Sequence, residues 1–258
     1  MLVKCASAPA GIPLMVKGID SIVILGGGTI TVTNDGHSYT SNTKIENLNP
    51  TKGVDIAMTS GEYNLNFLSK ENILDLRGYM ANDNDNSILV DISQFNWNSV
   101  IQHIQGNSKT FIGNFKPSAK TNLSRLGAFR IQGYSPNYDG ISADLSDFSE
   151  AVNLNIFECN SKNVVGNIES LAKCTLLETL YLTNTLVTGE VNTLAAAQVA
   201  NGRDGTVVRT LTIDNVTGLL THNGTPITSA YVQSQGGTSK TVITFDSSYT
   251  GGYQVSFA

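Results

Sequence analysis

The chain has 258 residues, of which 40% are hydrophobic and 14% charged, and its formal net charge is −5 at pH 7. The small net charge and the even spread of aliphatic residues argue against a disordered chain. The acidic balance and the lack of a Lys/Arg cluster argue against a nucleic-acid partner, and no apolar run reaches the roughly 20 residues of a membrane span.

Asn, Thr, Ser and Gly replace the missing charged residues, which favours strands and turns over helices. The first residues contain no apolar stretch of signal-peptide length, so either the chain is not exported by that route, which we expect, or its signal has been removed. Three cysteines are too few and too scattered for a disulfide framework. Together these features favour assembly inside a reducing cell.

The N-terminal part contains two β-rich runs, residues 21–25 and 29–33, separated by three glycines. Asn34-Asp35-Gly36 follows the second run and is a hairpin signal. We predict that residues 1–65 form a small antiparallel β module that caps the rest of the chain or docks to a partner.

An alternation of Asn and Asp at residues 82–86 superficially suggests a calcium loop. An EF-hand would need a glycine after the third ligand and a distal glutamate, and Leu89 and Gln94 stand downstream instead. We therefore favour a solvated loop, and a weak cation site near Asp83 and Asp85 stays open.

A repeated apolar pattern dominates the middle of the chain. The clearest unit reads LETLYLTNTLVTGEVNTL from Leu177, and the same offsets recur from Leu154. Looser copies start at Ile101, Leu126 and Val208. The shared positions in the two best units are Leu154/Leu177, Phe157/Leu180, Cys159/Leu182, Val164/Val187, Gly166/Gly189, Ile168/Val191 and Leu171/Leu194.

The pattern predicts stacked coils. The last two apolar residues of L-x-x-L-x-L point inward on a short strand. The glycine then permits a turn or close approach before a second extended stretch. One coil cannot bury its own apolar edge, so neighbouring coils share a hydrophobic column, with Leu154 beside Leu177 and Ile168 beside Val191.

L-x-x-L-x-L followed by V-x-G-x-I/V-x-x-L resembles leucine-rich repeats over about residues 73–220. The resemblance implies a mainly β fold, an irregular leucine-rich-repeat-like solenoid over residues 66–222 with small antiparallel β modules at both ends. The family's inward Asn is replaced by Lys162, Thr185 and Val216. The turns therefore need other hydrogen-bond partners.

The C-terminal part, residues 223–258, contains three alternating runs at 230–233, 241–245 and 253–257. Gly236-Gly237 and Gly251-Gly252 lie between the runs, so we predict a three-stranded β meander. Just before it in the last repeat, residues 201–205 break the regular unit length, and we expect them to form a protruding hairpin or loop.

The residues that usually carry chemistry are dispersed. The three histidines His37, His103 and His222 each stand alone, without zinc-ligand spacing. Cys159 takes a strand position that is leucine in the next unit, which predicts a buried thiol. The glutamates are spread over different coils, and nothing selects a catalytic pair. We predict no catalytic residue, cofactor or metal.

The repeat places the x positions of L-x-x-L-x-L on an open strand face. One predicted column contains His103, Ala128, Ile156, Thr179 and Thr210, and the second contains Gln105, Arg130, Glu158, Tyr181 and Thr212. This polar, mixed-charge surface suits contact with a protein or glycan. A solvated sheet face is the alternative. The candidate binding residues are His103, Gln105, Arg130, Ile156, Glu158, Thr179, Tyr181, Thr210 and Thr212.

Three functions remain open. The first is a non-enzymatic structural component of a tailed-bacteriophage virion, a capsid decoration, fibre-like or tail-associated protein, because the irregular coils are diffusely similar to repeats of such virion proteins. It would be assembled in the host cytoplasm with other virion proteins or as a homo-oligomer. The second is a bacterial cell-surface leucine-rich-repeat adhesin that binds protein or glycan. The third is a carbohydrate-active β-solenoid enzyme.

Overall fold

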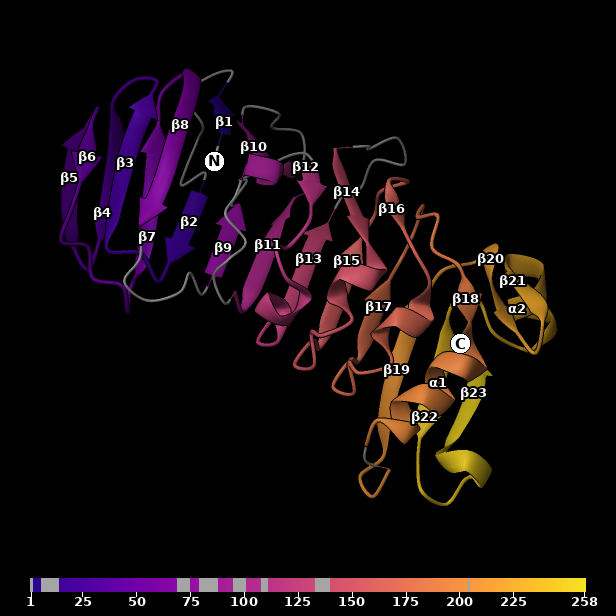
Figure 1. Ribbon diagram of the computed structural model, residues 1–258. Coiled ribbons are helices and arrows are strands. Elements are labelled where there is room, and N and C mark those ends of the chain that lie inside the picture. The colour runs from indigo at the N-terminus through magenta and orange to yellow at the C-terminus, as the bar shows by residue number, and fades with distance from the viewer. Residues whose placement is uncertain are drawn as a thin grey trace.

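The computed structural model describes residues 2–5, 14–68, 75–78, 88–94, 101–107, 111–132, 140–203 and 205–258. The protein is mainly β, as predicted, and its strands form two long sheets and one small sheet (Figure 1). Neither long sheet closes on itself. The predicted loop at Asp83 and Asp85 lies outside the described residues, and so do the repeat positions Ile73, Phe95 and Tyr138.

The larger sheet has twelve strands, and its central strands β9 to β19 run parallel. Antiparallel strands extend it at both ends. In sheet order the strands are β5 (His37–Ser41), β4 (Ile30–Asn34), β7 (Gly53–Met58), β2 (Leu14–Lys17), β9 (Asp75–Gly78), β11 (His103–Asn107), β13 (Ala128–Gln132), β15 (Ile156–Cys159), β17 (Thr179–Tyr181), β19 (Arg209–Asp214), β22 (Thr241–Phe245) and β23 (Tyr253–Phe257).

The second sheet has eight strands, with a parallel part from β10 to β16. In order they are β6 (Lys44–Ile45), β3 (Ser21–Gly26), β8 (Gly61–Leu68), β1 (Leu2–Cys5), β10 (Ile88–Asp91), β12 (Phe111–Phe115), β14 (Ile141–Asp144) and β16 (Val164–Val165). The small sheet contains β18 (Gly189–Glu190), β20 (Thr217–His222) and β21 (Thr225–Thr228).

Short helices follow strands of the second and small sheets, except η5, which lies between β22 and β23 of the large sheet. The α-helices are α1 (Val191–Ala200) and α2 (Ser229–Ser234), and the 3-10 helices are η1 (Ile92–Gln94), η2 (Lys120–Leu123), η3 (Leu145–Phe148), η4 (Ile168–Leu171) and η5 (Thr250–Gly252). From β11 to β18 the chain alternates between the large sheet and the other two, so strands far apart in sequence lie side by side (Figure 1).

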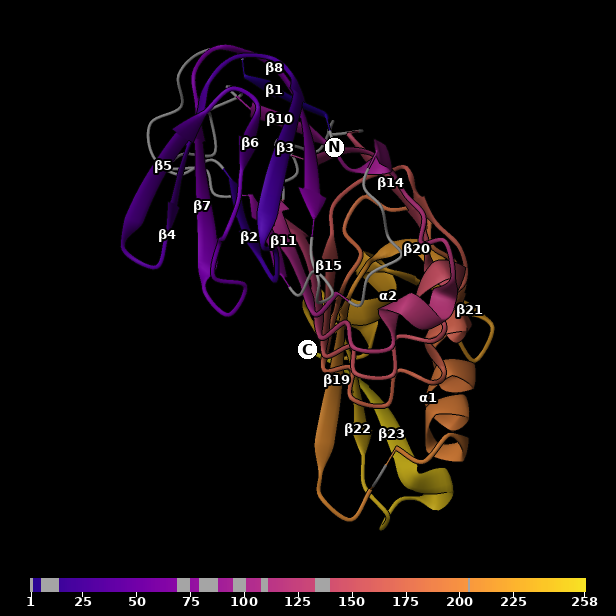
Figure 2. The same ribbon diagram turned by 60° about the vertical axis from the view of Figure 1, so that its left-hand side comes forward.

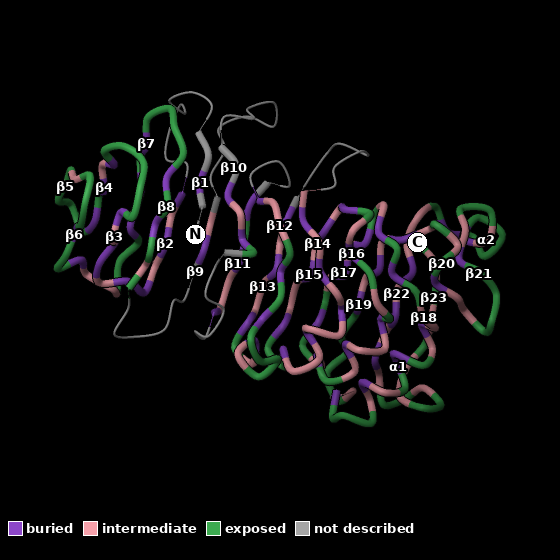
Figure 3. Tube along the Cα trace, turned by 45° about the horizontal axis from the view of Figure 1, so that its top comes forward, coloured by how far each residue is buried: buried purple, intermediate pink, exposed green. Residues whose placement is uncertain are grey.

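One apolar row runs across the parallel strands of the large sheet. Ile104, Phe129, Phe157, Leu180 and Ile213 pair in succession, and all five side chains are fully buried. Buried and exposed stretches accordingly alternate along the chain (Figure 3). The row follows from alternation at period two, because every second residue of a strand points to the same face.

The predicted neighbours of the two best units lie in adjacent layers. The Glu178 N–H donates to the Asn155 carbonyl oxygen at 2.8 Å, which sets Leu177 beside Leu154. In the second half of the unit, Asn167 bridges to Thr188 in parallel. A Cβ at Gly189 would lie 2.7 Å from Ile168 Cγ1, so the recurring glycine does permit a close approach between successive repeat units.

Buried polar side chains provide the turn partners that the missing Asn positions would have supplied. Ser161 Oγ donates to the Ile141 carbonyl oxygen at 2.8 Å, and Thr185 Oγ1 donates to the Leu182 carbonyl oxygen at 2.8 Å. In the next unit Asn215 Nδ2 reaches the Leu182 carbonyl oxygen at 3.3 Å. The Leu182 carbonyl oxygen also accepts the Thr185 N–H at 3.1 Å, so the two side chains add to the backbone bonding of that turn, while Ser161 joins its turn to strand β14.

The N-terminal module differs from the single small sheet that we predicted. The hairpin at Asp35 and Gly36 is confirmed, since β4 pairs with β5 and both residues have positive φ, 50° and 79°. However, β3 joins the eight-stranded sheet while β4 joins the twelve-stranded one, so the strands lie in two facing layers (Figure 2). The module thereby extends both sheets and covers the apolar end of their core.

The C-terminal meander is corrected at its first strand. Residues 230–233 lie in helix α2, because the Thr228 side chain caps the helix by accepting a hydrogen bond from the Tyr231 N–H. The other two runs are the predicted strands β22 and β23, and β22 pairs with β19. The boundaries at residues 65/66 and 222/223 stay predictions, although the β20–β21 hairpin spans the second.

The predicted protruding insertion at residues 201–205 folds back onto the core at Arg203, which is only 4% exposed. Its Nη1 donates to Gln198 Oε1 at 2.8 Å, and its Cζ lies 3.9 Å from the centroid of the Phe245 ring. Asn201 and Gly202 are exposed, as expected for a turn, whereas Asp204 lies outside the described residues. Arg203 is therefore held in the core by a cation–π contact with Phe245 and by the amide of Gln198, whereas the sequence pattern predicted a protruding loop there.

Candidate functional site

The predicted strand face is present on the outer side of the large sheet. His103, Ala128, Ile156 and Thr179 pair in succession, as do Gln105, Arg130, Glu158 and Tyr181. The two rows have the predicted order over four consecutive strands. Parallel strands lie about 4.8 Å apart, so each row presents side chains at a regular spacing.

The last members of both rows are wrong. Thr212, not Thr210, lies opposite Thr179, and Asp214, not Thr212, lies opposite Tyr181. The prediction counted from Val208 as the first apolar residue of the unit, but Val208 is 60% exposed. The inward residue Ile213 sets the register instead, because it pairs with Leu180.

The rows also continue upstream of the predicted residues. Asp75 lies opposite His103, and Arg77 lies opposite Gln105. The sequence contained a signal for them, since both residues flank Leu76, an apolar residue that fits the first half of an upstream repeat unit and is fully buried. The face therefore spans the parallel strands from β9 to β19.

One pair of opposite charges lies within this face, and a lysine from outside the rows contacts its tyrosine. Arg130 Nε donates to Glu158 Oε2 at 3.0 Å, and both side chains are partly buried. Lys240 Nζ lies 5.5 Å from the centroid of the half-buried Tyr181 ring. An exposed ion pair or cation–π contact adds about 1 kcal/mol or less. These two contacts therefore hold the polar side chains of the face in fixed positions, and they contribute little to the free energy of unfolding.

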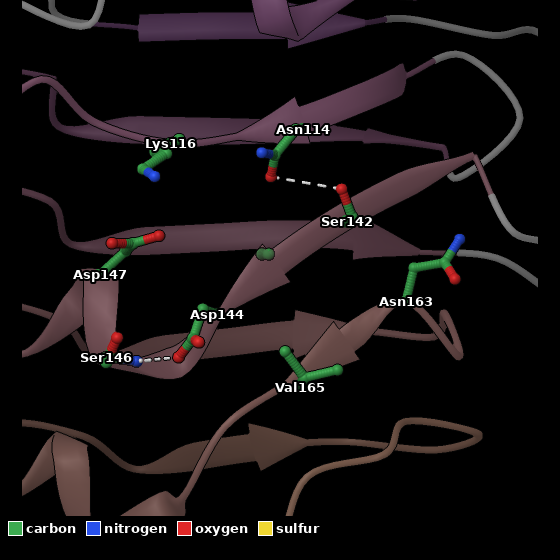
Figure 4. A pocket seen from close by; sticks show the side chains of 9 residues that line it. Asn114, Lys116, Ser142, Asp144, Ser146, Asp147, Asn163 and Val165 are labelled. Atoms are coloured by element: carbon green, nitrogen blue, oxygen red, sulfur yellow. Dashed lines mark hydrogen bonds between the residues drawn. The ribbon is translucent and has the colours of Figure 1, made fainter.

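A polar hollow on the second sheet was not predicted from the sequence. Its volume is about 300 Å³, and strands β12, β14 and β16 form it together with η3 (Figure 4). Its lining residues are Asn114, Lys116, Ser142, Ala143, Asp144, Ser146, Asp147, Asn163 and Val165. Because only the large-sheet strand of each unit had been assigned an outer face, these positions on the other strand were not considered.

Hydrogen bonds fix part of the hollow. Ser142 Oγ donates to Asn114 Oδ1 at 3.2 Å, and the Ser146 N–H donates to Asp144 Oδ1 at 2.8 Å. The second bond caps η3, so Asp144 has a structural task there. In Figure 4 the Asn114 and Ser142 side chains approach each other from neighbouring strands.

Asp147 is the titrating group with a shifted pKa in this hollow. Burial, and then the neighbouring Asp144, raise the pKa of the Asp147 carboxyl, and Lys120 and Lys116 partly offset the rise. Its protonated form can donate a hydrogen bond that the carboxylate cannot. The hollow therefore presents amide, hydroxyl, ammonium and carboxyl groups to a polar ligand.

The two thiols whose surroundings are described are buried. Cys159 takes the predicted inward strand position, and neither it nor Cys174 forms a disulfide. Burial raises the pKa of both thiols to about 12. A thiol with that pKa is not a nucleophile at neutral pH.

No family model, curated protein or solved structure matches the chain. Within the described ranges, no group of three or more His, Cys, Asp or Glu side chains is placed to hold a metal ion. In the same part of the chain, no helix is long and apolar enough to cross a membrane.

Proposed function

We propose that the parallel parts of the sheets form an irregular leucine-rich-repeat-like solenoid and that the protein is a non-enzymatic binding scaffold. The support for the solenoid is the repeated order of large-sheet strand, turn, second strand and short helix. The continuous buried row from Ile104 to Ile213 also supports it. Stacked coils of this kind create extended surfaces rather than deep pockets.

The observation that carries the binding proposal is the pair of polar rows on the outer face of the large sheet. Gln105, Arg130, Glu158, Tyr181 and Asp214 lie on successive strands. Tyr and Arg are enriched where protein interfaces gain most of their binding energy. A rigid sheet holds both at fixed spacing, which lowers the ordering cost on binding.

We propose that the partner is another protein of the virion of a tailed bacteriophage. The support for this setting is the sequence character alone: few cysteines, an Asn-, Thr- and Gly-rich composition and irregular coils. A bacterial surface adhesin remains the alternative setting. Mass spectrometry of purified particles tests the first, which predicts this chain as a stoichiometric component.

Affinity capture with matched variants tests the face itself. Tyr181→Ala removes the aromatic group of the second row, and Tyr249→Ala removes another half-exposed tyrosine from outside the rows. The proposal predicts that a partner captured by the wild type and by Tyr249→Ala is lost with Tyr181→Ala, without a large drop in melting temperature. Equal capture by both variants would place the binding surface elsewhere.

The polar hollow favours glycan contact as a second candidate function. About 300 Å³ is enough for a sugar ring, and Asn114, Ser142, Asp147 and Asn163 offer partners for its hydroxyl groups. NMR titration with a panel of neutral sugars tests this candidate. Saturable shifts of the Ser142 and Asn163 amides that Asp147→Asn weakens would support it, and unchanged spectra would exclude it.

A further inference from the structure

The outer edge of β23 carries backbone groups that β22 does not use. Strand β23 is the last in the order of the large sheet, and within the described part of the chain it pairs with β22 alone. Lys240 and Ala258 exchange backbone hydrogen bonds at 2.9 Å. Hydrogen-bonded pairs in an antiparallel ladder recur at every second residue. Gln254 and Ser256 therefore bond to β22, by the same alternation.

The three intervening residues point their N–H and C=O groups away from β22. They are Tyr253, Val255 and Phe257. Among the described residues, no backbone hydrogen bond reaches this edge of the sheet. The edge thus offers donors and acceptors at the spacing of a further strand.

The side chains of β23 leave the same edge incompletely covered. Val255 and Phe257 lie on the inward face and pack against the core, yet both are only half-buried. Ile243, which pairs with Val255 one strand further in, is fully buried. One additional strand would complete the burial of this apolar row.

Nothing within the strand YQVSF itself blocks such pairing, while at its two ends Gly252 lies next to Val199 of α1 and the rings of His222 and Tyr231 pack against Phe257. Proteins commonly protect a sheet edge with a charged residue, a proline or a bulge. Strand β23 has no charged residue and no proline, and its register with β22 runs without a shift from Tyr253 to Phe257. The neighbouring pairs are antiparallel, so an antiparallel strand would continue the sheet.

We propose that β23 pairs antiparallel with β23 of a second copy of this chain, across a two-fold axis at Val255. This register sets Val255 opposite its own copy, Tyr253 opposite Phe257, and Gln254 opposite Ser256. It brings apolar side chains together on the inward face and neutral polar ones on the outward face. A two-fold interface must be self-complementary, and this register is. The inference does not rest on the proposed binding face.

Light scattering coupled to size-exclusion chromatography tests the proposal over a concentration series. The wild type is expected to show the mass of two chains. Gln254→Lys combined with Ser256→Lys sets like charges opposite each other at exposed positions, so this variant is expected to be monomeric with an unchanged melting temperature. The corresponding double Glu variant behaves in the same way, and mixing the two variants restores a dimer.

Val255→Pro provides a second test that acts on the backbone. It removes an N–H that the chain itself does not use, whereas Val255→Thr keeps that N–H and a β-branched side chain. Proline is expected to give a folded monomer, and threonine a dimer. A monomeric wild type at every concentration, a dimer that tolerates the Lys pair, or an open-ended polymer formed through the opposite edge β5 would each overturn the proposal.

Discussion

Gly166 lies so close to Asp144 in the preceding repeat unit that a Cβ at residue 166 would sit 2.7 Å from Asp144 Oδ1. It would also approach the Leu145 backbone nitrogen to 3.0 Å. Asp144 caps η3 at this point, so the glycine allows one repeat unit to pack on the helix cap of its neighbour. Gly113 and Gly189 make the same approach to Asp91 and Asn167.

Gly166→Ala is expected to lower the free energy of unfolding by about 2–4 kcal/mol, because it adds a clash to an unfavourable φ of 108°. Gly202→Ala is the matched control. Residue 202 also has a positive φ, 89°, but no atom would lie within 4 Å of a Cβ added there. Urea titration of both variants measures these losses, and the control is expected to lose only about 1 kcal/mol of the free energy of unfolding. Equal losses would show that packing between coils is not the constraint.

Phe148 is the centre of an aromatic cluster in the core. Its ring centroid lies 5.0 Å from those of Phe115 and Phe157, which come from neighbouring units of the chain. Phe148→Ala is expected to cost about 3–5 kcal/mol through lost burial and an unfilled cavity, while Phe148→Leu should cost clearly less. Chemical denaturation checks both, and a loss below about 1 kcal/mol for alanine would contradict this packing.

Glu190 anchors the β20–β21 hairpin to the end of the small sheet. Its carboxylate accepts hydrogen bonds from Thr221 Oγ1 at 2.7 Å and from the Asn223 and Gly224 N–H groups at 3.0 and 3.1 Å. Burial alone would raise the pKa of Glu190, but these bonds and one from the Asn192 N–H outweigh it and lower the pKa. The charged form is therefore the one that the folded state prefers.

Glu190→Gln is expected to cost about 1 kcal/mol at neutral pH, a small loss for charged hydrogen bonds because the group is only partly buried. Since the folded pKa lies below the ordinary value of 4.5, the wild-type advantage exists above that pH. It disappears as the pH falls through the folded pKa. Thermal melts of both proteins from pH 7 to pH 2 check this, and a pH-independent difference would contradict it.

The alternation of inward apolar and outward residues along each strand made much of the parallel region of the large sheet predictable. Each inward residue from Ile104 to Leu180 is apolar, and a one-residue slip would turn all of them outward, so the register follows from the pattern. The close approach at Gly166 was predictable for the same reason, because it recurred at a fixed offset. Cys159 followed the same logic and is buried.

Features that depend on tertiary contacts were not predictable from the pattern. Residues 230–233 were interpreted as an alternating strand, yet a side-chain cap from Thr228 starts a helix there. Arg203 is buried between Gln198 and Phe245, and Phe245 comes from a distant part of the chain. The predicted register of the last unit was wrong by two residues, so that Thr212 was assigned to the wrong row. The error arose because Val208 is apolar like a core residue but is exposed.

The candidate site was predicted in part. The order from Gln105 to Tyr181 needed only the repeat, whereas the ion pair of Arg130 with Glu158 depends on side-chain conformations. The polar hollow combines residues of β12 and β14 with Asp147 of η3. The repeat units in this region differ in length, so the spacing of the residues in the sequence did not predict that they lie together.

Thiol cross-linking of neighbouring strands tests the coil stacking on which the proposed face depends. Single cysteines are introduced in pairs on the outer face and reacted with a short bifunctional reagent, with Ile156→Cys/Thr179→Cys as the reference pair. The stacking described above predicts efficient cross-linking of Thr179→Cys with Thr212→Cys and little with Thr210→Cys. Preferential cross-linking to residue 210, or none to either residue or in the reference pair, would contradict it.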